Sequence, residues 1–199
     1  MKKLQNFING KFVDGASGET TTLINPSTGQ AFATAPKSNA ADIDKAMQAA
    51  RDAFPRWRDS TPSERQRALL KIADAIEARA DEFVNIESEN CGKPKGLTAS
   101  EEIPPMVDQI RFFAGAARNL EGRSAAEYTH GMTSFIRREP IGVCAQVTPW
   151  NYPMMMAVWK WAPAIAAGNT VVLKPSDTTP ASTLFMAGIM GEFLPDGVI

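Results

Sequence analysis

The segment 141–180 constrains the fold of this chain more than any other part of the sequence. It contains an apolar strand over 142–147, a helix over 155–167 that Gly168-Asn169 ends, and a β-branched strand over 170–173. Strand, helix and strand in this order predict one βαβ unit with parallel strands. Pro163 inside the helix predicts a kink. An apolar first strand is typical of a parallel sheet covered on both faces, so the sequence predicts an α/β fold.

Polar residues follow each strand of this unit directly. The first strand runs into Thr148-Pro149-Trp150-Asn151-Tyr152, and the second runs into Lys174-Pro175-Ser176-Asp177. Pro149 cannot donate a hydrogen bond to a strand and Pro153 follows it closely, so the residues between them lie on a constrained turn. Ligands of open α/β sheets bind at the carboxyl ends of the strands. The sequence therefore predicts a ligand site where these two turns meet.

Three long strings in this region resemble one known family. They are RREPIGVCAQ, TPWNYP and WKWAPAIAAGNTVVLKPSDTTP, and weaker similarity extends over the whole chain. The chain resembles the aldehyde dehydrogenases, which oxidise aldehydes to acids with NAD or NADP. The strings NCGKP and EIPPMVDQIRFFAGAARNLEG are similar to the aminobutyraldehyde and betaine aldehyde dehydrogenases. The resemblance implies a Rossmann-like parallel sheet, a small aldehyde substrate, NAD as the cofactor and a homo-oligomer in the intact protein.

The resemblance also implies how the chain is divided. We expect hairpins and helices of the cofactor-binding domain over 1–125, an oligomerisation hairpin over 126–140, and the first βαβα of the dinucleotide-binding domain over 141–199. In the family, the nucleophilic cysteine, its general-base glutamate and a second glycine-rich turn come after the position that matches Ile199. We therefore expect an amino-terminal fragment without the catalytic domain, inactive by itself. The alternative is a non-catalytic chain, either truncated or an interaction module that pairs with full-length subunits through its hairpin.

Two residues are catalytic candidates. The resemblance gives the side-chain amide of Asn151 the role of donor to the developing oxyanion, a role that suits an amide held at a strand end. Without the resemblance, an asparagine in a turn is usually structural. Lys160 interrupts an apolar helix, and in betaine aldehyde dehydrogenases the matching lysine is assigned to proton relay with the general base. A structural lysine that reaches water along the helix is the alternative.

The cofactor is expected along both turns, and the candidate contacts are Thr148, Pro149, Trp150, Asn151, Lys174, Pro175, Ser176 and Asp177. By resemblance, Lys174 and Asp177 lie at the adenosine ribose. A lysine can donate to ribose hydroxyls there, and a carboxylate can accept from them while it repels a 2′-phosphate, which favours NAD. Many relatives carry glutamate at the position of Asp177, so NADP stays open. The alternative is a solvated charge pair on a loop.

The other reactive or bulky side chains are assigned to structure. Trp159, Trp161 and the methionines of 154–156 are expected in the core, although Met155 and Met156 are suited to lining an aldehyde tunnel. Neither Cys91 nor Cys144 has a histidine or glutamate at an activating spacing, and no metal-ligand spacing is present. The single histidine, His130, is expected to be solvated.

Composition excludes several classes of function. The 21 Lys and Arg balance 22 Asp and Glu, so no overall field favours nucleic acid or an anionic membrane. The amino terminus lacks an apolar run typical of a signal peptide, and the segment 154–167 is too short to span a membrane. A cytoplasmic location is expected.

The rest of the chain predicts hairpins and helices. The sequence predicts a hairpin over 7–13 around Asn9-Gly10, a strand over 31–35, a helix from Asn39 that ends before Pro55, and a helix from Thr61 with a kink near 80–81. It further predicts a long helix over about 100–120 with Pro104 and Pro105 in its first turn, a hairpin over 127–138, and a last helix over 181–193.

Overall fold

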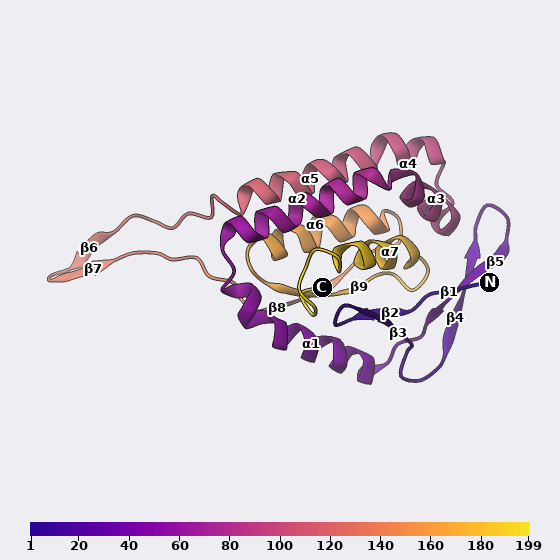
Figure 1. Ribbon diagram of the computed structural model, residues 1–199, viewed down its shortest axis with the longest axis horizontal. Coiled ribbons are helices and arrows are strands. Elements are labelled where there is room, and N and C mark those ends of the chain that lie inside the picture. The colour runs from indigo at the N-terminus through magenta and orange to yellow at the C-terminus, as the bar shows by residue number, and fades with distance from the viewer.

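The computed structural model describes residues 1–199, and Figure 1 shows a helical layer, a small parallel sheet and one long projecting hairpin. The helices are α1 (Ala40–Arg58), α2 (Pro62–Ala78), α3 (Ala80–Cys91), α4 (Lys95–Glu101), α5 (Ile103–Ala116), α6 (Pro153–Ala166) and α7 (Ala181–Met190). The strands are β1 (Lys2–Lys3), β2 (Asn6–Ile8), β3 (Lys11–Val13), β4 (Thr20–Asn25), β5 (Gln30–Pro36), β6 (Ala126–Thr129), β7 (Met132–Ser134), β8 (Val143–Val147) and β9 (Thr170–Lys174).

The predicted βαβ unit is confirmed. β8 and β9 pair in parallel from Val143 opposite Thr170 to Val147 opposite Lys174, with α6 as the crossover. The pairing continues past β8, because the Thr148 backbone N–H donates to the Lys174 carbonyl at 3.1 Å. The two polar turns therefore begin side by side at one edge of the sheet.

The end of α6 is fixed by side chains from distant parts of the chain. Trp57 Nε1 donates to the Ile165 carbonyl at 3.2 Å, and the buried Arg65 donates from Nε to the Ala166 carbonyl at 2.9 Å. Carbonyls in the last turn of a helix have no partner inside the helix, and a cation there also opposes the negative end of the helix dipole. Asn169 completes the join to β8, because its Oδ1 accepts from the backbone N–H groups of residues 141 and 142 at 2.7 and 3.1 Å.

The sheet lies between two layers of helix (Figure 1). One core cluster of 27 buried residues joins α2, α3, α5, α6 and α7. On the other side, α1 lies along β9, and the Thr170 hydroxyl of β9 donates to the Ala50 carbonyl of α1 at 2.9 Å. Helices on both sides hold the strand ends against a rigid framework.

The expectation that the first strand is covered on both faces is wrong. β8 is an edge strand of a two-stranded sheet, its residues are half-buried or exposed, and Val147 is 65% exposed. Its apolar composition predicted burial that only a further strand or layer would provide. The prediction that Trp159 lies in the core is also wrong, because Trp159 is 48% exposed. Trp161 is buried, as predicted.

Several helix boundaries differ from the sequence prediction. Pro55 lies inside α1, which continues to Arg58, because the following turn buries Trp57. The predicted long helix is two helices, α4 and α5, that meet at Glu102, and α5 ends at Ala116 instead of near residue 120. The helix from Thr61 is also two helices, α2 and α3, separated at Arg79, next to the kink predicted near 80–81. The last helix ends at Met190, before residue 193.

Two hairpins are present where the sequence predicted them. β2 and β3 are joined by Asn9 and Gly10, whose φ angles of 52° and 74° fit a type I′ turn. β6 and β7 form the hairpin that projects from the body (Figure 1), and β7 ends at Ser134, earlier than the predicted arm over 133–138. β1 and β4, which were not predicted from the sequence, flank β5 in a three-stranded sheet. No helix has the length and apolar character to cross a membrane.

Candidate active site

The first turn at the sheet edge presents an unengaged amide. Asn151 is exposed, and its side chain makes no hydrogen bond to another protein group. Pro153 occupies the first position of α6, so Asn151 stands just before the amino-terminal end of a 14-residue helix. The free N–H groups and the dipole at such an end favour negative charge. The turn can therefore stabilise an anion that lies against it.

A buried hydroxyl lies at the start of this turn. Thr148 is 3% exposed, and its Oγ1 has no hydrogen-bond partner within the protein. A buried polar atom without a partner is uncommon, because desolvation is then not compensated. Its position at the end of β8 makes it a candidate donor or acceptor for a ligand.

The second turn carries an ion pair that a ligand can reach. Lys174 Nζ lies 2.6 Å from Asp177 Oδ1, and the side chains of the two residues are 52% and 83% exposed. Lys174 Nζ also donates to the Pro175 carbonyl at 3.2 Å, and Ser176 Oγ lies 3.0 Å from Thr178 Oγ1. Because exposed ion pairs contribute little stability, hydroxyl groups of a ligand can exchange into this arrangement at low cost.

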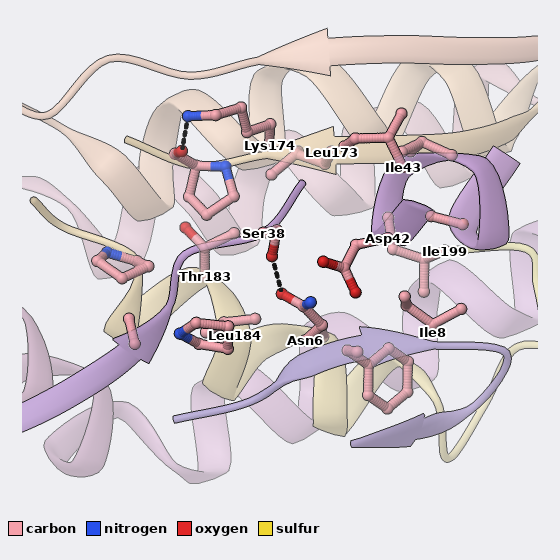
Figure 2. A pocket seen from close by; sticks show the side chains of 18 of the residues that line it. Asn6, Ile8, Ser38, Asp42, Ile43, Leu173, Lys174, Thr183, Leu184 and Ile199 are labelled. Atoms are coloured by element: carbon pink, nitrogen blue, oxygen red, sulfur yellow. Dashed lines mark hydrogen bonds between the residues drawn. The ribbon is translucent and has the colours of Figure 1, made fainter. Parts of the chain in front are cut away.

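A cavity of about 460 Å³ lies beside the second turn. Figure 2 shows Lys174 and Leu173 along one side of it, Asp42 and Ile43 of α1 beyond them, and Asn6 and Ile8 of β2 on the opposite wall. Residues 175–177, the two α7 residues Thr183 and Leu184, and Ile199 at the end of the chain are also among the 26 residues that line it. Small-ligand pockets are typically about 300–1,000 Å³, mostly apolar, with a few polar groups, which describes this cavity.

The structure brings most of the predicted site residues to one edge of the sheet, in two groups. Lys174, Pro175, Ser176 and Asp177 line the larger cavity, and Trp150 lines a second cavity of about 270 Å³ that Asp177 also borders. Thr148 and Asn151 line neither cavity, although Thr148 is bonded to the backbone of Lys174. Pro149 lies between them on the turn.

Lys160 is not brought to these groups. Its side chain is half-buried, forms no ion pair and borders neither cavity. Only its backbone carbonyl is engaged, by Gln146 Nε2 at 2.9 Å. Met155 and Met156 are likewise half-buried and outside both cavities.

Neither cysteine is an activated nucleophile. Burial, together with the neighbouring carboxylate of Glu87, raises the pKa of the Cys91 thiol to about 12. Burial also raises the pKa of Cys144. A cysteine nucleophile reacts as the thiolate, so both thiols are unreactive near neutral pH. Both cysteines are free, and no group of three or more histidine, cysteine, aspartate or glutamate side chains could hold a metal ion.

Three charged residues that were not predicted from the sequence pack behind the first turn. Lys93 lies between Glu87 and Glu102, and it also contacts the ring of Tyr152. Burial, together with the nearby Glu102 carboxylate, raises the pKa of Glu87 to about 7, and burial also raises the pKa of Glu102. The spacing of Glu87 after Phe83 and Val84 was an available signal, because it puts a carboxylate on the buried face of its helix.

Comparisons with known proteins agree on one family. Residues 12–199 match the aldehyde dehydrogenase family. The chain is 43% identical to a probable aldehyde dehydrogenase of Mycobacterium tuberculosis and 43% identical to an acetaldehyde dehydrogenase of Pseudomonas aeruginosa, over 99% and 98% of its own length. Those alignments cover 39% and 38% of the relatives, so the chain spans well under half of their length.

Solved structures give the same result. PnpE from Pseudomonas sp. WBC-3 is 41% identical and superposes with a TM-score of 0.95 over 100% of this chain and 40% of PnpE. A second PnpE structure, in complex with nicotinamide adenine dinucleotide, gives the same score over 98% of this chain.

Proposed function

The chain belongs to the aldehyde dehydrogenase family, and from that premise we propose that it supplies the oxyanion donor and part of the NAD site of an enzyme that oxidises an aldehyde to a carboxylic acid. The observation that carries the proposal is the meeting of the two turns at one sheet edge, with the free amide of Asn151 on one and the Lys174–Asp177 pair on the other.

The residues present fit a dinucleotide. Lys174 can donate to ribose hydroxyls and Asp177 can accept from them, and the adjoining cavity of about 460 Å³ can hold an adenosine moiety. The unpartnered hydroxyl of Thr148 adds a polar group on the same edge. Asp177 also places a carboxylate where a 2′-phosphate would be repelled, which favours NAD over NADP.

NAD, when bound, accepts the hydride of the aldehyde carbon, so that aldehyde, NAD⁺ and water become acid, NADH and a proton. The part of this chain in the reaction is electrostatic. Attack on the carbonyl leaves negative charge on its oxygen, and the Asn151 amide donates to that oxygen next to the positive end of α6. Cys91 and Cys144 are poor nucleophiles, so we propose that the attacking group comes from outside these 199 residues.

The substrate proposal is a small aldehyde. An aminoaldehyde is the finer candidate, on the similarity of NCGKP and of the 102–122 segment to aminobutyraldehyde and betaine aldehyde dehydrogenases. The relatives described above, called aldehyde or acetaldehyde dehydrogenases, favour the broader class. A comparison of kcat/KM for acetaldehyde and for 4-aminobutyraldehyde would separate the two.

The test uses a hybrid enzyme in which residues 1–199 are joined to the carboxyl-terminal part of the acetaldehyde dehydrogenase of Pseudomonas aeruginosa. Asn151→Ala in this hybrid enzyme is expected to lower kcat by about 10²- to 10³-fold with the KM for NAD unchanged, because one oxyanion donor is lost. Lys174→Ala is expected to raise mainly the KM for NAD. If the two variants exchange these effects, the roles of the two turns have been assigned the wrong way round.

A non-catalytic role as an interaction module is the second candidate, and the observation in its favour is the β6–β7 hairpin. Tyr128 and Met132 on the hairpin are 77% and 63% exposed, and Phe135 and Ile136, which follow β7, are 71% and 50% exposed. Such a surface suits association with another subunit. Association of the chain with a full-length relative, measured by sedimentation, without any contribution to turnover would favour this candidate.

A further inference from the structure

Three charged side chains are buried together behind the Asn151 turn. Lys93 Nζ lies 2.5 Å from Glu102 Oε1 and 3.6 Å from Glu87 Oε1, and the side chains of Lys93, Glu87 and Glu102 are 14%, 0% and 1% exposed. Burying charges costs more than their pairing returns in many proteins, so a buried ion pair by itself is weak support for a stabilising role. Stability alone therefore does not explain why these three charged side chains lie together.

The chain is shaped to bring Lys93 to this place. α3 ends at Cys91, and the next residue, Gly92, has a φ of 75°, a left-handed conformation that ends the helix before Lys93. A Cβ atom at position 92 would lie 2.7 Å from Pro26 Cγ, so only glycine fits there without displacing Pro26 in the loop after β4. Position 93 is therefore fixed by the backbone.

Lys93 and Cys91 contact the turn on the two sides of Asn151. The ammonium of Lys93 lies 3.8 Å from the centroid of the Tyr152 ring, within the range of a cation–π interaction. On the other side, Cys91 Sγ lies 3.9 Å from the Trp150 carbonyl. Asn151 itself makes no bond that would hold its side chain, so its direction depends on the residues on either side.

We propose that Lys93, held between the carboxylates of Glu87 and Glu102, is a positioning residue that fixes the turn 148–152 and thereby aims the amide of Asn151. The inference rests on the proposed function for the role of Asn151, but not for the contact with Tyr152. A misplacement of about 1 Å in a catalytic group can cost about 10²-fold in rate, so a contact that holds the turn can matter without touching substrate.

The cluster also makes the position of the turn sensitive to pH. The titratable groups that face Lys93 are Glu87 and Cys91 of α3, Glu102 at the start of α5, and Tyr152 at the start of α6, while α7 contributes Ser182 beside Glu87. The ionised Glu87 carboxylate, 3.6 Å from the ammonium of Lys93, competes for that ammonium with the Tyr152 ring, whose centroid is 3.8 Å from it. Burial raises the pKa of Glu87 to about 7, so this ionisation falls near neutral pH.

The kinetic test compares three lysine variants of the hybrid enzyme. Lys93→Met is expected to lower kcat by about 10- to 10²-fold with the KM for NAD within about 2-fold. Lys93→Arg should recover most of the rate, because a guanidinium also pairs with carboxylates and stacks on an aromatic ring. Lys95→Met makes the same change at an exposed lysine outside the cluster and should leave both constants unchanged.

A second pair of variants leaves the buried charges paired. Tyr152→Leu removes the ring and should lower kcat as Lys93→Met does, whereas Tyr152→Phe keeps the ring face and should recover the rate. If Tyr152→Leu and Lys93→Met keep kcat within about 2-fold while Asn151→Ala lowers it, the positioning role is wrong and the proposed function stands.

Glu87→Gln tests the dependence on pH. When kcat is plotted against pH, the hybrid enzyme should show a change near pH 7, and Glu87→Gln should remove this change.

A structural readout separates this inference from the proposed function. In the 199-residue chain labelled with nitrogen-15, the side-chain amide resonances of Asn151 should shift or broaden in Lys93→Met and Tyr152→Leu but not in Lys95→Met. An unchanged Asn151 amide in both variants overturns the inference. If the amide moves but Asn151→Ala leaves kcat of the hybrid enzyme unchanged, the contact is established and the catalytic role of Asn151 is refuted.

Discussion

Replacing Glu87 by glutamine tests whether the buried carboxyl behind the turn sets a pH dependence of stability. The pKa of Glu87 rises from the usual 4.5 to about 7, chiefly because burial disfavours the charged form. An acid with a raised pKa holds its proton longer in the folded state. Its favourable contribution is therefore complete below pH 4.5 and is lost as the pH rises through about 7.

The size of this effect follows from the two pKa values. At about 1.4 kcal/mol for each pH unit between 4.5 and about 7, the free energy of unfolding of the wild-type chain should fall by about 3 kcal/mol. Neutral glutamate and glutamine have similar shape, so Glu87→Gln should match the wild type near pH 5. At pH 8 the variant should be more stable than the wild type by about the same 3 kcal/mol, because it has no buried charge to form.

Urea unfolding of the 199-residue chain followed by fluorescence of its four tryptophans gives the free energy of unfolding at each pH. Glu89→Gln is the matched control, since Glu89 lies on the same helix with its side chain exposed, and it should keep the wild-type slope. Parallel curves for the wild type and Glu87→Gln between pH 5 and pH 8 would refute the reasoning.

Three further outcomes are expected. Asn90→Ala should lower the free energy of unfolding by about 1–3 kcal/mol in thermal melts, because Asn90 Nδ2 donates to the Thr178 carbonyl at 2.9 Å and its Oδ1 accepts from the Ala181 N–H at 3.0 Å; an unchanged melting temperature would contradict this. Cys91 should react with a disulfide reagent at pH 8 about 10³-fold more slowly than a thiol of pKa 9.0, and a rate like that of free cysteine would show that the thiol is not buried. The 199-residue chain alone should not oxidise aldehydes with NAD, and a rate that Cys91→Ser or Cys144→Ser abolished would identify a nucleophile where we find none.

Local signals in the sequence predicted the parts of the fold that depend on local chemistry. The capping residues Asn39 and Thr61 each form the two-way bond of a capping box, and Asn9-Gly10 forms its tight turn. Helix boundaries that depend on tertiary contacts were not predictable in this way. Pro55 stays inside α1 because burial of Trp57 in the next turn outweighs the bond that proline removes.

The same distinction between local signals and tertiary contacts applies to the candidate site. The polar turns after β8 and β9 were predictable, because the apolar strands end sharply at Thr148 and Lys174. The wall of the cavity formed by β2 and α1 was not predictable, since Asn6 and Asp42 lie far from the turns in sequence and no period connects them. The contact of Lys93 with the first turn was missed for the same reason, because Tyr152 lies far from it in the sequence, although its partners Glu87 and Glu102 lie close to it.

The positions of the two turns depend on contacts with residues 90–93 as well as on the βαβ unit that contains the turns. Asn90, near the end of α3, bonds to the segment that follows the second turn, at the Thr178 carbonyl and at the N–H of Ala181, the first residue of α7. Lys93, three residues later, contacts the first turn through Tyr152. The short segment 90–93 thus contacts the chain at the ends of both β8 and β9. Because β8 is an edge strand with few contacts of its own at this end, the spacing between the two turns depends on this segment as well as on the pairing of Thr148 with Lys174. A change at Asn90 should therefore affect the ribose side, and a change at Lys93 the oxyanion side, although neither residue is expected to touch a substrate.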